Sequence, residues 1–245
     1  GGRNHSENCE LFMQSLNVVY AEMISDDILS RRAASFYRAK RRYEELLDSH
    51  RRLTFNRMIA LAVKHLQDRP QVLEHVRHLI VDEYQDINRA QEHLIQLIGR
   101  SGSIFIVGDP RQTIYRFRGS DACCFDEFSR IFPDSVTISI TENRRSIRSI
   151  VTLANEFADH FEGENYDHLE AIRTGDGGTY IGDMSSDIAE AEWVANQIEN
   201  YVQNGHCSYR DIGILFRSVH TSGPKFIDVF QRRGIPFIVG GKEGL

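Results

Sequence analysis

One segment decides the fold: LIVDEYQD, from Leu79 to Asp86. A short apolar run ends there in two neighbouring acids, as at the carboxyl end of a buried strand. Ligands of an open parallel sheet bind at that edge. Asp82 is therefore a candidate ligand of Mg²⁺, and Glu83 is a candidate base that polarises water for attack on a terminal phosphate. Alternatively, both acids only begin the next helix, whose dipole favours negative charge there.

The residues around this segment predict half of an α/β domain. The apolar runs 78–81 and 103–107 have the length and the bounding turn residues of buried parallel strands. Between them, the segment 88–98 has apolar positions at helical spacing and closes with Gly99. We therefore expect a right-handed strand–helix–strand crossover.

Two further regions flank this unit. Apolar residues from Cys9 to about Gln67 recur at helical spacing among many charges, which predicts helices. After Pro133 a second α/β rhythm begins, so we place a domain junction near that residue. The expected strands are 136–140, 180–183, 212–216 and 236–239, and the expected helices are 146–160, 187–203 and 224–233.

Composition restricts the class of protein. The 245 residues carry 29 Lys and Arg against 35 Asp and Glu, a formal net charge of −6, so any nucleic-acid contact must come from a local basic surface. The 4 cysteines show no CxxC spacing, which indicates neither a zinc site nor a disulfide framework and fits a reducing, cytoplasmic compartment. No apolar run reaches the roughly 18 residues of a membrane helix, so we expect no membrane partner.

One local basic run lies between Arg31 and Arg52. It comprises Arg31, Arg32, Arg38, Lys40, Arg41, Arg42, Arg51 and Arg52. Such a run can follow nucleic-acid phosphates, but a solvated helix face is the more common reason for it. We favour the solvated face and keep the other interpretation open.

The segment 108–121, GDPRQTIYRFRGSD, follows the second expected strand. Together with DEYQD it resembles motifs II and III of UvrD/Rep/PcrA-type superfamily 1 DNA helicases, in the same order and at a similar spacing. The resemblance implies that Asp82 binds Mg²⁺ and that Glu83 activates water. It also implies that Gln112 reaches the γ-phosphate of ATP and couples the nucleotide state to the grip on DNA.

The same motif implies contacts with single-stranded DNA. Tyr115 and Phe117 correspond to the aromatic residues that stack on bases, a contact with little sequence preference. Arg116 and Arg118 lie between and beside them and would meet phosphates or stack on bases. The alternative for both rings is core packing, which alternating aromatic residues often indicate.

The segment 141–146, TENRRS, resembles motif IV of the family. The resemblance implies that Arg145 is an arginine finger that stabilises charge on the transferred phosphoryl group. Arg144 stands where the family has an aromatic residue that stacks on adenine. A planar guanidinium can stack on a base too, so Arg144 is either a nucleotide-binding residue or a surface arginine.

The resemblance covers nearly everything from Leu53 onward. It implies an α/β fold made of parts of two RecA-like P-loop NTPase motor domains. The parts are the end of a 1B-like helical insertion at 1–52, the second half of a 1A-like domain at 53–133 and the first half of a 2A-like domain at 134–245. It implies an ATP-dependent DNA helicase of repair or replication, with ATP and Mg²⁺, that acts on single strands and at their junctions with duplex DNA.

One part of such a motor is missing from the sequence. The phosphate-binding loop G-x-x-x-x-G-K-[ST] does not occur, and the nearest string, 240–243, lacks the Ser or Thr that ligates Mg²⁺. We therefore expect an internal fragment of a longer helicase chain, with negligible ATP hydrolysis by itself. In isolation it could also form oligomers or swap domains.

Two other functions remain open. A RecB/AddA-type helicase-nuclease would carry its nuclease domain beyond Leu245. A non-hydrolysing helicase-like module would bind DNA or a partner protein. The combination of Asp82, Glu83, Gln112 and Arg145 argues against this second alternative, because a scaffold has no need of all four residues.

Overall fold

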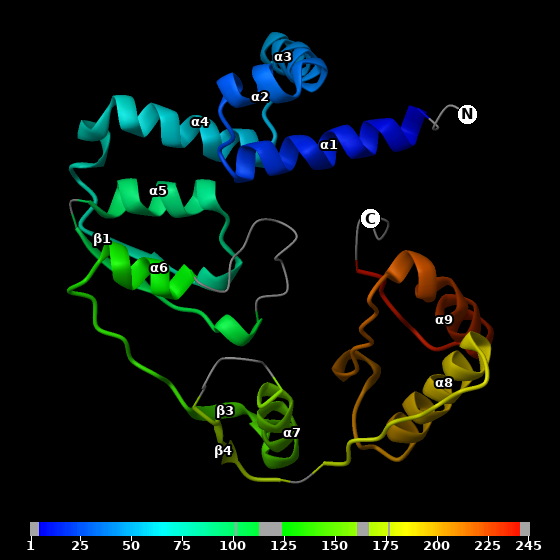
Figure 1. Cartoon of the computed structure of the whole chain (residues 1–245). Helices are drawn as coiled ribbons and strands as arrows, with labels where there is room; N and C mark the ends of the chain where they lie inside the picture. Colours follow the sequence, from blue (N-terminus) through cyan, green and yellow to red (C-terminus); the bar gives the residue numbers. More distant parts are fainter. Residues whose placement is uncertain (1–4, 101, 113–123, 161–166, 176, 241–245) are drawn as a thin grey trace. The chain divides into compact units, whose positions relative to one another are not determined.

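The computed structural model describes residues 5–100, 102–112, 124–160, 167–175 and 177–240. The chain divides into two compact units (Figure 1). The first unit is Gly1–Ile140 with His160–Asp167, and the second is Thr141–Asp159 with His168–Leu245. Each unit combines helices with a two-stranded parallel sheet, so the predicted α/β class is confirmed. No described helix is long and apolar enough to cross a membrane.

The first unit begins with helices, as predicted for 9–67. They are α1 (His5–Ala21), α2 (Asp26–Arg32), α3 (Ala34–Ser49) and α4 (Phe55–Asp68). Two of them start at capping residues that the sequence supplies. Ser25 caps α2 by accepting a hydrogen bond from the backbone amide of Ile28, and Thr54 caps α4 by accepting one from the amide of Arg57.

The sheet of the first unit consists of β1 (His78–Val81) and β2 (Ser103–Ile106), which run parallel. The helix α5 (Arg89–Gly99) connects them and packs against α4, so the predicted strand–helix–strand connection is confirmed (Figure 1). Asn88 and Gln91 form a capping box at the start of α5. The other elements of this unit are η1 (Pro70–Leu73), η2 (Tyr84–Asp86), η3 (Pro110–Gln112) and α6 (Cys124–Ile131).

One face of this sheet is covered and the other is open. The covered face packs against the buried side chains of Tyr84, Ile95 and Phe128. On the opposite face Ile80 is 74% exposed and Phe105 is 59% exposed. The prediction of fully buried strands is therefore wrong for one face, because nothing in the described part of the unit covers these side chains.

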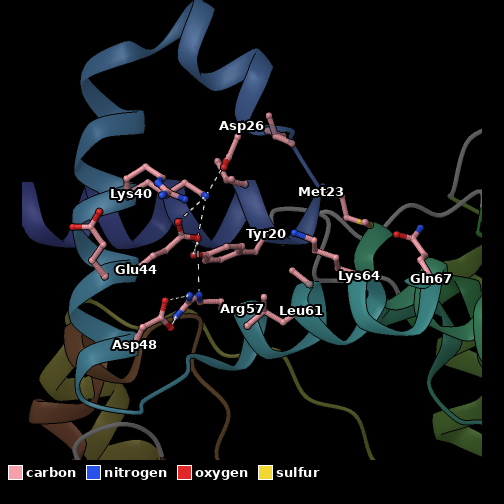
Figure 2. A pocket seen from close by; sticks show the side chains of 15 residues that line it. Tyr20, Met23, Asp26, Lys40, Glu44, Asp48, Arg57, Leu61, Lys64 and Gln67 are labelled. Atoms are coloured by element: carbon pink, nitrogen blue, oxygen red, sulfur yellow. Dashed lines mark hydrogen bonds and ion pairs between the residues drawn. The ribbon is translucent and has the colours of Figure 1, made fainter. Parts of the chain in front are cut away.

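A cavity of about 480 Å³ lies among the first four helices and contains a buried ion pair (Figure 2). Lys40 of α3 is 5% exposed. Its Nζ donates hydrogen bonds to Asp26 of α2 at 2.8 Å and to Glu44 at 3.1 Å. Tyr20 of α1 donates to the same Glu44 carboxylate at 2.8 Å. The interpretation of the basic run as a solvated face is wrong for Lys40, because this lysine links three helices.

Arg57 makes a second ionic contact in this region (Figure 2). It lies on α4, is 7% exposed, and its Nη2 donates to Oδ2 of Asp48 on α3 at 2.9 Å. This hydrogen bond lowers the pKa of the Asp48 carboxyl and raises the pKa of the Arg57 guanidinium. Burial, with the hydrogen bond to Glu44, raises the pKa of the Tyr20 phenol well above its usual value. At neutral pH Asp48 is therefore ionised, Arg57 is charged and Tyr20 is neutral.

We expect Lys40→Met to lower the free energy of unfolding by about 3 kcal/mol, because the largely buried Glu44 carboxylate would keep only the more distant Arg57, 3.9 Å away, as a cation. The Glu44 side chain is only 14% exposed and would lose its nearest cation. Urea denaturation followed by circular dichroism measures the change. Arg42→Met is the matched control, since the pair of Arg42 with Glu45 is exposed and such pairs contribute less than about 1 kcal/mol. Equal losses in the two variants would contradict this expectation.

The second unit contains its own parallel pair, β3 (Glu142–Ile147) and β4 (Glu170–Arg173). The helix α7 (Arg148–Ala158) packs against both strands. Asn155 of α7 fixes the approach to β4, because its side-chain amide donates to the Leu169 carbonyl at 2.9 Å and its carbonyl accepts from the Leu169 amide at 3.0 Å. The helix α7 is thus joined by two hydrogen bonds to the residue that directly precedes β4.

Two longer helices complete the second unit. They are α8 (Asp187–Gln203), which matches its predicted bounds, and α9 (Val219–Arg233), with the short η5 (Tyr209–Asp211) between them. Both helices contribute to a buried core that also contains Ile235. Arg233 of α9 donates to Glu192 at 2.9 Å and to Glu199 at 2.5 Å, both on α8. The predicted start of α9 at Pro224 is wrong, because this proline is accommodated within the helix.

The four strands predicted after Pro133 are also wrong. The segments are 136–140, 180–183, 212–216 and 236–239, and none has a strand partner among the described residues. Ile181, Leu215 and Ile238 are 99%, 97% and 96% exposed. An alternating apolar segment becomes a strand only when a neighbouring backbone completes its hydrogen bonds. The strand β3 forms instead at Glu142–Ile147, directly after the segment 136–140 that was expected to be a strand.

Candidate functional site

The first two acids of the DEYQD segment, Asp82 and Glu83, lie directly after β1 with exposed side chains. Oδ1 of Asp82 accepts a hydrogen bond from the Glu83 amide at 2.9 Å, and Oδ2 has no partner in the described part of the chain. The backbone of Glu83 is left-handed, with φ 52° and ψ 42°. Residues other than glycine adopt this conformation at a cost of about 1 kcal/mol, and such strain is concentrated at functional sites.

The next two residues are buried and anchor the acids. The hydroxyl of Tyr84 donates to Glu92 of α5 at 2.6 Å. The side chain of Gln85 is 1% exposed; its Nε2 donates to Oε2 of Glu83 at 2.7 Å, and its Oε1 accepts from the backbone amide of Asp109 at 3.0 Å. Gln85 therefore connects the ends of two neighbouring strands.

The end of β2 is shaped by a glycine and an aspartate. A Cβ on Gly108 would lie 2.3 Å from Oε1 of Gln85, so only glycine permits this approach. The Asp109 carboxylate accepts hydrogen bonds from Arg111 Nε and Gln112 Nε2, each at 3.0 Å. Burial by itself raises the pKa of Asp109, but these hydrogen bonds outweigh it and lower the pKa overall. The carboxylate therefore holds Gln112 through a charge-assisted bond.

The structure brings three of the predicted site residues, Asp82, Glu83 and Gln112, to one edge of the first sheet. Hydrogen bonds connect Glu83 to Gln112 through Gln85 and Asp109. Sequence reasoning missed these two intermediate residues. Their signal was present, since both lie inside the motifs, but a motif does not reveal which of its polar side chains meet.

The other predicted nucleotide contacts lie on β3 of the second unit. The Arg144 side chain is 78% exposed and pairs with Glu142 at 2.6 Å. The Arg145 side chain is exposed and forms no ion pair in the described part of the unit. Its carbonyl accepts a hydrogen bond from Arg173 at 3.1 Å, and its amide donates to Asn143 at 3.1 Å. The guanidinium of Arg145 is thus available to an anion while its backbone is fixed.

The predicted DNA-binding residues Tyr115, Arg116, Phe117 and Arg118 fall in 113–123, outside the described residues. Their roles stay predictions. The DNA contacts of the motif therefore rest on the sequence, whereas the positions of Asp82, Glu83 and Gln112 come from the structure.

A metal ion fits the strand edge in a limited way. The described residues contain no group of three or more acids, histidines or cysteines that could hold a metal by themselves. Mg²⁺ is commonly held by one or two carboxylates together with phosphate oxygens and water, and Asp82 with its free Oδ2 suits that role. The cavity of Figure 2 suits an ion less well, because its acidic and basic side chains balance and none belongs to the motifs.

Comparisons with known proteins match both parts of the chain to domains of UvrD-type helicases. The profile of the UvrD/REP helicase N-terminal domain matches residues 9–133, and that of the UvrD-like helicase C-terminal domain matches residues 138–245. The chain is 34% identical over 239 residues to the ATP-dependent DNA helicase UvrD1 of Mycobacterium leprae, over 90% of this chain and 30% of that protein.

A second group of relatives carries another name. The chain is 28% identical over 229 residues to the ATP-dependent DNA helicase PcrA of Staphylococcus aureus, over 91% of this chain and 31% of that protein. The chain spans about 30% of the length of these relatives. The fold, the motifs and both profiles agree: the chain belongs to the UvrD/REP family of superfamily 1 helicases.

Proposed function

We propose that this protein is part of an ATP-dependent DNA helicase motor that moves along single-stranded DNA and unwinds duplex DNA. Membership of the family and the names of the relatives support the proposal. The observation that carries it is the hydrogen-bonded edge from Glu83 through Gln85 and Asp109 to Gln112. It holds a carboxylate for water and an amide for phosphate in a fixed arrangement, and phosphoryl transfer depends mainly on such positioning.

Four residues have separate roles in the proposed hydrolysis. Asp82 would hold Mg²⁺, which supplies positive charge to the phosphate oxygens. Glu83 polarises the attacking water and accepts its proton on Oε1, since Oε2 accepts the hydrogen bond from Gln85. The bond between the γ-phosphorus and the oxygen of the leaving ADP breaks as the water oxygen attacks. Gln112 and Arg145 contact the γ-phosphate, where negative charge accumulates.

The proposed contacts with DNA are in the GDPRQTIYRFRGSD segment. Tyr115 and Phe117 stack on successive bases, and each stacked base contributes roughly 1–3 kcal/mol. Arg116 and Arg118 bind phosphates, which provides the local positive charge that an acidic chain needs. Arg144, which pairs with Glu142, either stacks on the nucleotide base or remains a surface residue.

The triphosphate itself needs a phosphate-binding loop, and the sequence contains none. We propose that another segment of a longer protein supplies this loop. The 245-residue chain alone would then have negligible turnover, because Asp82 and Glu83 would have no anchored nucleotide to act on.

ATP hydrolysis with and without single-stranded DNA tests the proposal. The complete protein should turn over ATP at roughly 1 s⁻¹ or faster when DNA is present, and it should unwind a duplex with a single-stranded tail. The isolated chain should show neither activity. A complete protein that binds single-stranded DNA tightly but hydrolyses no ATP would refute the motor and indicate a non-hydrolysing module.

A further inference from the structure

The buried side chain of Gln85 contacts neither water nor phosphate in the proposed hydrolysis. Both of its polar ends are engaged, Nε2 with the Glu83 carboxylate at 2.7 Å and Oε1 with the Asp109 amide at 3.0 Å. A primary amide can donate at one end and accept at the other, which neither a carboxylate nor an apolar side chain of similar size can do. The chemistry of the position therefore matches the chemistry of a glutamine.

The bridge closes the sheet edge beyond the last strand pair. Glu83 follows β1 and Asp109 follows β2. Gln85 and Asp109, which the hydrogen bond joins, are 24 positions apart in the sequence. The Tyr84 amide donates to the Val107 carbonyl at 2.9 Å beside it. The Val107 amide also donates to the Val81 carbonyl at 2.8 Å, so the strand ends are held by two backbone hydrogen bonds and one side-chain hydrogen bond.

The geometry leaves Gln85 little freedom. A Cβ on Gly108 would meet Oε1 of Gln85 at 2.3 Å and the ring of Phe125 at 2.9 Å, so the carbonyl end of the side chain is tightly enclosed. Glu83, by contrast, is an exposed residue, and Gln85 is its one side-chain hydrogen-bond partner in the described part of the unit. A buried residue therefore restrains an exposed one.

We propose that Gln85 is a positioning residue for ATP hydrolysis. It holds Oε2 of Glu83 so that Oε1 is presented to the attacking water. Its Oε1 accepts a hydrogen bond from the Asp109 amide, and this bond anchors Gln85 itself to the end of β2. This inference rests on the proposed function, because a positioned base has meaning only where a water attacks a phosphate.

The test replaces Gln85 in the complete protein. Gln85→Met keeps the volume and removes both hydrogen bonds, and Gln85→Asn keeps the amide but is one methylene too short for the bridge. Each should lower the kcat of DNA-stimulated ATP hydrolysis by roughly 10- to 100-fold, because a small displacement of a reacting group has an effect of that order. The KM for ATP and the affinity for a fluorescent ADP analogue should change by less than about twofold.

Gln96→Met is the matched control for loss of a glutamine–glutamate contact. Gln96 lies on α5 and donates at 3.1 Å to Oε1 of Glu92, whose other oxygen accepts from Tyr84, so Gln96 contacts neither Glu83 nor Gln85. Its kcat should stay within about twofold of wild type. Thermal unfolding of all variants identifies any that fail to fold, and Gln85→Asn keeps the question open to test if Gln85→Met is one of them.

A double-mutant cycle separates positioning from general damage. In a Glu83→Gln background, where the positioned carboxylate is gone, Gln85→Met should lower the residual single-turnover rate by no more than about twofold. An equal loss in both backgrounds, or a wild-type kcat in Gln85→Asn and Gln85→Met, would overturn the inference. Absence of DNA-stimulated hydrolysis in the wild-type protein would instead refute the proposed function, whatever the variants do.

Discussion

Replacing Arg145 with alanine is expected to lower the kcat of DNA-stimulated ATP hydrolysis by about 10³-fold or more in the complete protein. An arginine finger stabilises the charge that builds up on the transferred phosphoryl group, and alanine removes that contribution entirely. Arg145 suits this role for two reasons. Its side chain is exposed and forms no ion pair in the described part of its unit, and hydrogen bonds with Asn143 and Arg173 hold its backbone. Steady-state hydrolysis with saturating single-stranded DNA measures the loss.

Two further variants sharpen the result for Arg145. Arg145→Lys should recover only part of the rate, because an ammonium group is a point charge without the planar fork of a guanidinium. Arg148→Ala removes an exposed arginine from the start of α7 and should leave kcat within about threefold of wild type. If Arg145→Ala hydrolysed ATP as fast as Arg148→Ala, Arg145 would not act on the phosphate.

Glu83→Gln is expected to lower kcat by roughly 10²- to 10⁴-fold, the contribution typical of a general base. The substitution keeps the size of the side chain and leaves an oxygen that can still accept the hydrogen bond from Gln85. What it removes is the negative charge that polarises water. Nucleotide affinity, measured with a fluorescent ADP analogue, should therefore stay close to wild type while the rate falls.

Glu74→Gln provides the control for Glu83. Glu74 is an exposed acid of the same unit, just after η1 and away from the strand ends. The Glu74→Gln protein should hydrolyse ATP at the wild-type rate. The Glu74→Gln and Glu83→Gln proteins should unfold at the same temperature. A Glu83→Gln protein that retained more than about a third of wild-type kcat would assign the water to another residue.

The parts of the fold that the sequence predicted well are those with local causes. The helix α8 begins after Ser186, whose side chain accepts from the Ala189 amide, and α5 begins after Asn88 with its capping box. The strands β1 and β2 are short apolar runs joined by one helix, which allows only one simple connection. Capping residues and crossover rules act within a few residues or one supersecondary unit, so they can be recognised without tertiary structure.

The parts that the sequence predicted poorly depend on distant partners. Alternating apolar residues at 212–216 fit a strand, yet Ile212, Ile214 and Phe216 only pack on the core of α8 and α9 while Leu215 is 97% exposed. The strand β3 contains two arginines and an asparagine, a composition that does not favour a strand, and it forms because β4 lies beside it. Strand pairing of this kind depends on which backbone segments lie side by side in the folded chain, and local sequence does not specify this.

The candidate site divides in the same way. The positions of Asp82 and Glu83 followed from the motif and from the rule that ligands bind at the carboxyl ends of parallel strands. The contact between Gln85 and Asp109 did not, because it joins residues far apart in sequence and depends on the absence of a side chain at Gly108. The ion pair of Lys40 was missed for a similar reason: a buried lysine and a solvated lysine look the same in a basic run.

The open face of the first sheet sets a practical condition for anyone who produces this segment separately. Ile80 and Phe105, exposed at 74% and 59%, are the kind of apolar surface on which chains self-associate, and β1 and β2 form a sheet of only two strands. Lysine at these two positions would keep the alternation of both strands and make the separate segment easier to keep in solution. Within a longer protein the same lysines would leave the stability of the fold unchanged only if this face of the sheet is exposed to solvent. Tolerance of charge at Ile80 and Phe105 therefore reports whether the face is a surface or an interior.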